Sequence, residues 1–259
     1  KARTYDDWIT LSTFVHNNDP YRHLCSIHGG TAKYINYTLP CFTHVSIQDQ
    51  GPLVAFEGPA TIRNIYGKPV IFDEVCYEGD HEARWAQLSG EEMLERIWTG
   101  LIGGAYVTHG ECFCTTPNYY TGYAFLATGG KFKGTSPARV KFTLSLLNSL
   151  SAPLRLADQS WDPYTASGGK GVYLRYFGKD MPGEWTFELP VRNGRFGRLQ
   201  EGMKFKVDII DTWNMTVTPC PETFILKAKN KYRMVDVDGS SVKLPSKPYL
   251  LLRITELQK

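Results

Sequence analysis

The sequence predicts an α/β plus all-β chain: the C-terminal half of a (β/α)₈ TIM barrel followed by a small antiparallel β-sandwich. Up to about residue 150, short apolar runs that end in polar residues alternate with helical segments. This alternation is typical of a parallel sheet whose site lies at the C-terminal ends of its strands. After about residue 152, only short strand-like runs separated by Gly, Pro and Asn remain. We therefore predict that residues 1–155 carry barrel strands five to eight and that residues 156–259 form the sandwich.

A doubly wound open sheet is the main alternative for the first part. No glycine-rich phosphate turn follows any predicted strand, so the commonest use of that fold, nucleotide binding, is not indicated.

Composition excludes several classes of function. The 259 residues are 42% hydrophobic and 13% aromatic, enough for one large or two moderate cores. The net charge of +3, without a basic block, predicts no nucleic-acid partner and no anionic membrane surface. No apolar run is long enough to cross a membrane, and the start, Lys1 to Tyr5, lacks the pattern of a signal peptide.

The six cysteines are scattered and do not form a disulfide framework, which favours a reducing, cytoplasmic location. Cys112 and Cys114 lie near His109 and could be read as metal ligands. Because no second closely spaced pair accompanies them, the spacing is unlike that of a structural zinc site. We expect no metal and no cofactor.

Helices are predicted from apolar spacing and caps. Trp8, Leu11 and Val15 recur at helical spacing, and Asp19 with Pro20 ends that helix. Ser89 and Glu92 are spaced as a capping box for the next clear helix, which ends near Gly103 and Gly104. Further helices are expected at residues 31–37, 58–66 and 136–147, the last with Ser136 as its N-cap and Pro137 in its first turn.

Strands are predicted from short apolar or β-branched runs. The four parallel strands are expected at residues 23–28, 42–48, 70–75 and 105–111. The sandwich strands are expected at residues 171–178, 184–189, 205–211, 215–217, 223–227 and 249–254.

The acids after the third parallel strand indicate a site. Asp73, Glu74, Glu78 and Asp80 are four acidic residues within eight positions. Ionised carboxylates so close together repel, so we expect at least one to protonate or to meet a cation or polar ligand. The alternative is a strand followed by a solvated acidic loop. Asp73 is expected to point away from Glu74, because neighbours on a strand face opposite sides.

Several blocks in the same order resemble the apiosidase-like glycoside hydrolases, over nearly the whole chain. The blocks are Pro69–Glu74 with Tyr77–Asp80, Gly103–Glu111, His23–His28, Thr43–Gln48 and the tail Ile210–Met215 with Leu244–Pro245 and Lys247–Tyr249. The resemblance implies a barrel of the large retaining-glycosidase clan with a C-terminal β-sandwich, and a carbohydrate substrate. Cys41 departs from the family pattern, which has a Trp there.

The resemblance implies that Glu74, at the end of strand seven, is the catalytic nucleophile. The alternative for Glu74 is an acid hydrogen-bonded to a neighbouring strand end. In that clan the acid/base lies at the end of strand four, before this chain begins. The partner that the resemblance implies is therefore the missing N-terminal barrel half.

The other polar strand ends are expected to contact the sugar. Their donors and acceptors suit hydroxyl groups, and an aromatic ring suits stacking on a sugar face. The alternative is a polar network that only satisfies buried strand ends. The predicted substrate-binding residues are His28, His44, Gln48, Tyr77, His109 and Glu111.

A second hypothesis is a non-catalytic carbohydrate-binding or interaction protein that uses the β-sandwich. The aromatic residues that could line its binding face are Trp161, Tyr164, Tyr173, Trp185 and Trp213. A binding module has no need for Glu74, His109 and Glu111 to converge at strand ends, and this convergence favours the enzyme.

Overall fold

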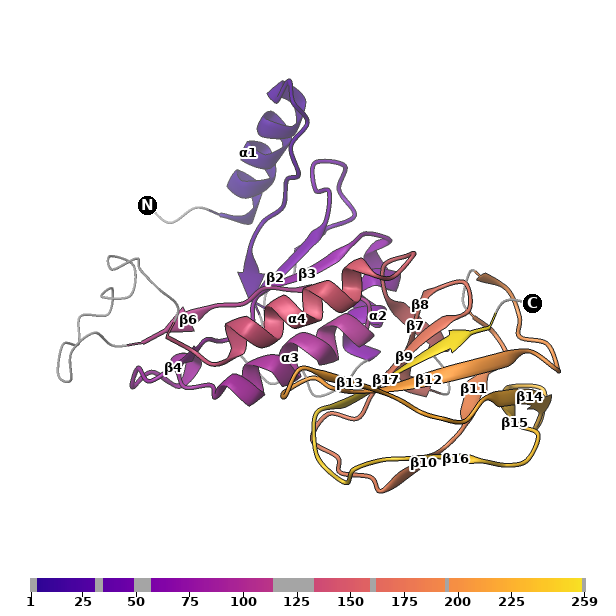
Figure 1. Ribbon diagram of the computed structural model, residues 1–259. Helices are drawn as coiled ribbons and strands as arrows, with labels where there is room; N and C mark the ends of the chain where they lie inside the picture. Colours follow the sequence, from indigo (N-terminus) through magenta and orange to yellow (C-terminus); the bar gives the residue numbers. More distant parts are fainter. Residues whose placement is uncertain are drawn as a thin grey trace.

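The computed structural model describes residues 4–30, 35–48, 57–113, 133–158, 162–193 and 196–257. Figure 1 shows helices and short strands in the first part of the chain and an antiparallel sheet in the second. Within the described ranges, every α-helix lies before residue 149. These helices are α1 (Tyr5–Asn18), α2 (Glu57–Tyr66), α3 (Gly90–Ile102) and α4 (Ser136–Asn148), with a short 3-10 helix η1 (Arg84–Ala86).

Local signals placed most of these helices correctly. The Ser89 hydroxyl accepts a hydrogen bond from the Glu92 backbone N–H, and the Glu92 carboxylate accepts one from the Ser89 backbone N–H. The predicted capping box of α3 is therefore confirmed. The expected role of Ser136 is wrong: Thr135 is the N-cap of α4, and Ser136 is already helical. The helix expected at residues 31–37 falls partly outside the described residues, and residues 35–37 are not helical.

The first part contains a small parallel sheet. Its strand order is β1-β2-β3-β5, and each neighbouring pair is parallel. The strands are β1 (Gly29–Gly30), β2 (Val45–Gln48), β3 (Val70–Glu74) and β5 (Tyr106–Val107). Just beyond them, β4 (Glu78–Gly79) pairs with β6 (Glu111–Cys112).

The second part is a nine-stranded antiparallel sheet, ordered β11-β15-β14-β12-β17-β9-β8-β7 with β13 paired to β12. A separate two-stranded ribbon is formed by β10 and β16. The bounds are β7 (Arg155–Asp158), β8 (Asp162–Gly169), β9 (Val172–Tyr176), β10 (Glu184–Thr186), β11 (Glu188–Pro190), β12 (Lys204–Asp211), β13 (Thr216–Pro219), β14 (Phe224–Ala228), β15 (Arg233–Asp236), β16 (Ser241–Lys243) and β17 (Leu250–Glu256).

The predicted half of a (β/α)₈ TIM barrel is wrong. The described chain is mostly β, its main sheet is antiparallel, and it has only four α-helices within those ranges. The run at residues 105–111 forms two separate two-residue strands, and the run at residues 23–28 forms no regular strand. Apolar runs reveal local strand propensity, whereas sheet size depends on pairing between distant segments. The second part, with the β10–β16 ribbon against the main sheet, is sandwich-like.

The main sheet packs a different core on each face. Leu174 and Tyr176 of β9 belong to the core shared with the helices, whereas Tyr173 between them belongs to the core that includes the ribbon. This alternation follows the two-residue period of a strand. Trp98 of α3 stacks on Tyr176 with ring centroids 5.7 Å apart. Helix α3 therefore joins the small parallel sheet to the antiparallel sheet. The boundary between residues 155 and 156 stays a prediction.

We expect a matched pair of leucine substitutions to reveal this shared core. Leu94 of α3 is fully buried, whereas Leu144 of α4 is 53% exposed. Leu94→Ala should lower the free energy of unfolding by about 2–5 kcal/mol, because it leaves a cavity. Leu144→Ala should change it by less than about 0.5 kcal/mol. Urea unfolding of both variants measures the difference, and equal effects would contradict the packing described.

Candidate functional site

A β-bulge at the end of β3 sets the geometry of the first polar cluster. Ile47 pairs with Phe72, but the next residue, Gln48, pairs with Glu74, so Asp73 is the extra residue. The expectation that Asp73 and Glu74 point apart is therefore wrong. His28 lies against both, with Nδ1 2.9 Å from Asp73 Oδ1 and Nε2 3.4 Å from Glu74 Oε2.

The charges in this cluster compensate one another. Contact with the Asp73 carboxylate raises the pKa of His28, burial opposes that change, and Gln48 and Glu74 add to it. On its other oxygen, Asp73 accepts a hydrogen bond from the Ser46 hydroxyl. The raised pKa favours the charged form of His28, and a positive charge between two carboxylates offsets the repulsion between adjacent acids.

Tyr77 approaches Glu74 from the segment after β3. Burial raises the pKa of Tyr77 to about 12, and the charge of Glu74 and a side-chain hydrogen bond with it act in the same direction. Tyr77 therefore keeps its proton and donates to the carboxylate. The preceding residue, Cys76, is buried and has a φ of 72°, a left-handed conformation that non-glycine residues rarely adopt. Such strained residues often occur at functional sites.

The structure thus brings four of the predicted residues together: Glu74, His28, Gln48 and Tyr77. The Glu74 side chain is 20% exposed, so solvent or a ligand can reach it. Tyr77 donates a hydrogen bond to this partly buried carboxylate and His28 lies 3.4 Å from it, so the carboxylate is held in a defined orientation, as nucleophilic catalysis requires.

Helix α3 supports the same strand end. Arg96 Nη1 donates to the carbonyl of Val75 at 2.8 Å, directly after Glu74. Trp85 packs edge-on against the Tyr77 ring with centroids 5.5 Å apart. On another side of that ring, Gly110 leaves no room for a side chain, because a Cβ there would lie 2.6 Å from a Tyr77 ring carbon. Tyr77 is consequently held by packing as well as by Glu74.

His44 does not join this cluster. It precedes β2, whereas Gln48 ends that strand, and its Nδ1 lies 2.9 Å from Thr43 Oγ1. Burial lowers the pKa of His44, and the charge of Asp73 opposes this. The His44 ring is therefore paired with a local hydroxyl group.

Glu78 is the centre of a second polar cluster at the start of α4. The side chain is buried and accepts from the backbone nitrogens of Thr135, at 2.6 Å, and Ser136, at 3.0 Å. Both hydroxyl groups also donate to it. Burial acts to raise the pKa of Glu78, but the donors of Ser136 and Thr135 together lower it. An ionised carboxylate here satisfies the free N–H groups of the helix.

His109 and Glu111 belong to this second cluster. His109 Nε2 lies 2.9 Å from Ser136 Oγ, and burial lowers the His109 pKa against the charges of Glu111 and Glu78. Glu111 accepts from the backbone nitrogens of Lys133 and Gly134. One ligand atom each of Glu78, His109 and Glu111 lie within 4.8 Å of one another, a spacing that a metal could use.

Glu78, His109 and Glu111 form hydrogen bonds that hold the start of α4 in place. The oxygens of both carboxylates already receive donors from residues 133–136, which lead into α4. Cys114, the other ligand considered, lies outside the described residues, and Cys112 is buried. The substrate contacts assigned to His109 and Glu111 stay a prediction.

Sequence reasoning missed two polar residues of the first cluster. Asp73 was set aside because a regular strand alternates its faces, and nothing in the local sequence marks the bulge. For Ser46, the alternative of a polar network at buried strand ends fits the structure, because it is buried and hydrogen-bonds to Asp73, but the sequence did not indicate that partner. A buried serine two residues from a strand end is the signal that could have suggested an acidic partner.

The aromatic face of the second hypothesis is only partly present. Tyr173 is fully buried, and Trp213 packs under Arg139, whose guanidinium carbon is 4.4 Å from the ring centroid. The guanidinium carbon of Arg175 lies 5.7 Å from the ring centroid of Tyr164 and 5.4 Å from that of Trp185. Trp161 lies outside the described residues.

Similarity to solved structures points to glycoside hydrolases. The chain is 48% identical to a "putative glycoside hydrolase" from Bacteroides vulgatus ATCC 8482, with a TM-score of 0.91 over 99% of this chain and 49% of that one. A second structure, described as "Glycoside hydrolase", is 14% identical with a TM-score of 0.60 over 98% of this chain and 62% of that one. The second match shows only a similar fold. The chain spans about half of the first protein's length.

The family model described as "Domain of unknown function (DUF5605)" matches residues 161–255, most of the antiparallel part. No protein with a curated description is significantly similar to the chain. Among the described helices, none has the length and apolar character needed to span a bilayer.

We expect Glu78→Gln to show that this carboxylate anchors α4. At neutral pH the substitution should lower the free energy of unfolding by about 1–3 kcal/mol, because buried donors lose a charged acceptor. The native pKa lies below the ordinary value of 4.5, so the stabilisation is present above that pH and is lost as pH falls through the native pKa. Urea unfolding across that range should show the two proteins converge in acid. The exposed Glu82→Gln is the matched control, and a constant difference at all pH values would contradict the assignment.

Proposed function

We propose that this chain carries part of the active site of a glycoside hydrolase that cleaves O-glycosyl bonds with retention of configuration. The observation that carries the proposal is the 48% identity to the Bacteroides vulgatus protein over 99% of this chain. The polar cluster at the end of β3 supports it, because it holds an accessible carboxylate among hydrogen-bond donors. Since the chain covers 49% of that protein, the activity of a whole enzyme is part of the proposal.

In this proposal Glu74 is the nucleophile. A retaining mechanism needs one ionised carboxylate that attacks the anomeric carbon and a second, roughly 5–5.5 Å away, that acts first as acid and then as base. Tyr77 donates a hydrogen bond to Glu74 and His28 lies 3.4 Å from it, so both limit the orientation of its carboxylate. Attack forms a bond between a Glu74 oxygen and the sugar while the glycosidic bond breaks, and water later releases the sugar. No cofactor takes part in either step.

Asp73 is unsuited to the role of acid/base. One of its oxygens accepts a hydrogen bond from the Ser46 hydroxyl and the other lies 2.9 Å from His28 Nδ1, so both oxygens face protein groups. We assign the acid/base to sequence outside these residues, corresponding to the half of the Bacteroides vulgatus chain that the match leaves out.

Exposed apolar residues of α1 support the proposal that a further polypeptide segment covers this helix. Figure 1 shows α1 standing away from the small sheet. Trp8 is 47% exposed and Phe14 64% exposed on this helix, and Leu24 beyond it is 76% exposed. Apolar surface gathered in this way is typical of a face that another segment covers. Strand β1, at the edge of the parallel sheet, also has a free side in the described part of the chain.

The proposed substrate is an oligosaccharide of plant or other glycan origin, as the resemblance to apiosidase-like enzymes implies. His28 and Gln48 offer donors and acceptors for sugar hydroxyls beside Glu74, and Tyr77 and Trp85 offer rings. His44, His109 and Glu111 are assigned more distant contacts, because each already has a protein partner.

We expect Glu74→Gln, made in the full-length protein, to reduce kcat on aryl glycosides about 10³-fold or more. The amide keeps the size of the side chain but cannot form the covalent intermediate. Its melting temperature should stay close to that of the unaltered protein, because Glu74 is partly exposed. Glu82→Gln, on an exposed residue of the neighbouring loop, should retain full activity. Turnover of Glu74→Gln within about tenfold of wild type would refute the assignment.

A further inference from the structure

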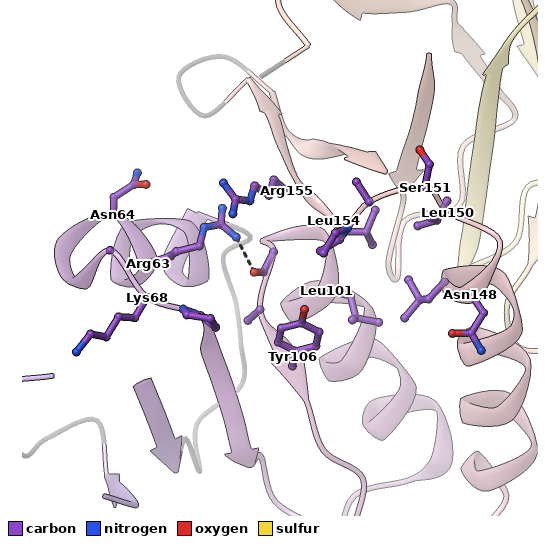
Figure 2. Close-up of a pocket in the computed structure, with 17 residues that line it drawn as sticks. Arg63, Asn64, Lys68, Leu101, Tyr106, Asn148, Leu150, Ser151, Leu154 and Arg155 are labelled. Atoms are coloured by element: carbon purple, nitrogen blue, oxygen red, sulfur yellow. Dashed lines mark hydrogen bonds between the residues drawn. The ribbon is translucent and has the colours of Figure 1, made fainter. Parts of the chain in front are cut away.

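A cavity of about 810 Å³ lies at the opposite ends of β3 and β5 from Glu74. Lys68 and Pro69, directly before β3, form one wall, and Gly104 and Ala105, directly before β5, form another. The residues that follow α4 close it toward the antiparallel sheet. Figure 2 shows the cavity between these segments. Its volume is within the range of about 300–1,000 Å³ that is usual for sites of small molecules.

Two arginines, Arg63 and Arg155, line this cavity, and no carboxylate lines it within the described residues. Arg63 is half-buried, and its Nη1 donates to the carbonyl of Gly104 at 2.6 Å. Figure 2 shows Arg155 with its guanidinium close to that of Arg63. No aspartate or glutamate is among the described residues that line the cavity. Burial and the charge of Arg155 lower the pKa of Arg63, so the two cations repel each other.

Lys68 does not add its charge to the cavity. Its ammonium donates to the backbone carbonyls of Tyr37, Leu39 and Phe42, at 2.6, 2.8 and 2.6 Å. In Figure 2 the side chain extends away from the two arginines. The positive charge inside the cavity is therefore that of Arg63 and Arg155.

The rest of the cavity combines the polar side chains of Asn64, Asn148 and Ser151 with an apolar wall. Leucines from α3, α4 and the segment after α4 line it, together with the ring of Tyr106, which is 52% exposed. These leucines are Leu101, Leu147, Leu150 and Leu154. An inorganic ion would contact only the arginines and leave this surface uncovered, so the cavity suits a ligand with an apolar or ring-shaped body.

We propose that this cavity binds a small organic oxyanion, whose phosphate or carboxylate group lies between Arg63 and Arg155 and whose body packs against Tyr106 and the leucines. Guanidinium groups match such anions with paired, charge-assisted hydrogen bonds. An anion would also offset the cost of holding two cations together at a partly desolvated position. Because the cavity and Glu74 lie at opposite ends of β3, this site is separate from the proposed glycosidase chemistry.

Titration calorimetry with phenyl phosphate and with inorganic phosphate tests the proposal, in buffers whose ionic strength is matched with sodium chloride. We expect the intact protein to bind phenyl phosphate, and to bind it at least tenfold more tightly than inorganic phosphate. Benzoate in place of phenyl phosphate distinguishes a preference for carboxylate from one for phosphate.

Arg155→Gln should weaken binding of the preferred anion at least tenfold, and Arg155→Lys should restore part of the affinity. The Arg155 side chain is exposed and has no hydrogen bond or ion pair among the described residues, so these variants should fold normally, as circular dichroism can verify. Arg198→Gln removes the same charge from an exposed residue outside the cavity and should leave affinity unchanged. Absence of binding by the wild type, or equal binding by Arg155→Gln, would overturn the proposal. Equal affinity for inorganic phosphate and phenyl phosphate would exclude a role for the apolar wall.

Discussion

The candidate site depends on one irregularity, the β-bulge that makes Asp73 an extra residue at the end of β3. The bulge turns two adjacent carboxylates toward the same histidine, which a regular strand cannot do. Their mutual repulsion is offset by His28 between them and by the Ser46 hydroxyl on Asp73. Asp73 accepts a hydrogen bond from Ser46 and contacts His28, whereas Glu74 contacts His28 and Tyr77, and both side chains are partly exposed.

Glu74 and Glu78, which lie at strand ends in the two polar clusters, have different structural roles. Glu78 is buried and its oxygens are fully used by the first residues of α4, so it organises the chain. Glu74 is partly exposed and contacts His28 and Tyr77. Helix α3 connects the small parallel sheet with the antiparallel sheet. Arg96 donates a hydrogen bond to the backbone at the end of β3, and Trp98 stacks on Tyr176 of the antiparallel sheet.

Features encoded by neighbouring residues could be predicted, and those set by distant contacts could not. The Ser89–Glu92 capping box follows from a spacing of three residues and is present. The fold class was wrong because strand pairing is non-local. For His109 and Glu111, the partners are 27 and 22 residues away in the sequence, so no local pattern indicated that they hold the start of α4. The grouping of Glu74 with His28 was foreseen from polar strand ends, whereas the bulge behind it was not.

Covalent trapping tests the central claim, that Glu74 is the nucleophile, most directly. The full-length protein is incubated with the 2-deoxy-2-fluoro dinitrophenyl form of a glycoside that it hydrolyses, because the fluorine slows release of the glycosyl-enzyme intermediate. Intact-mass and peptide analysis should then find one fluorosugar per chain, attached to the peptide that contains Glu74. Labelling of a different carboxylate, with Glu74 unmodified, would contradict the account.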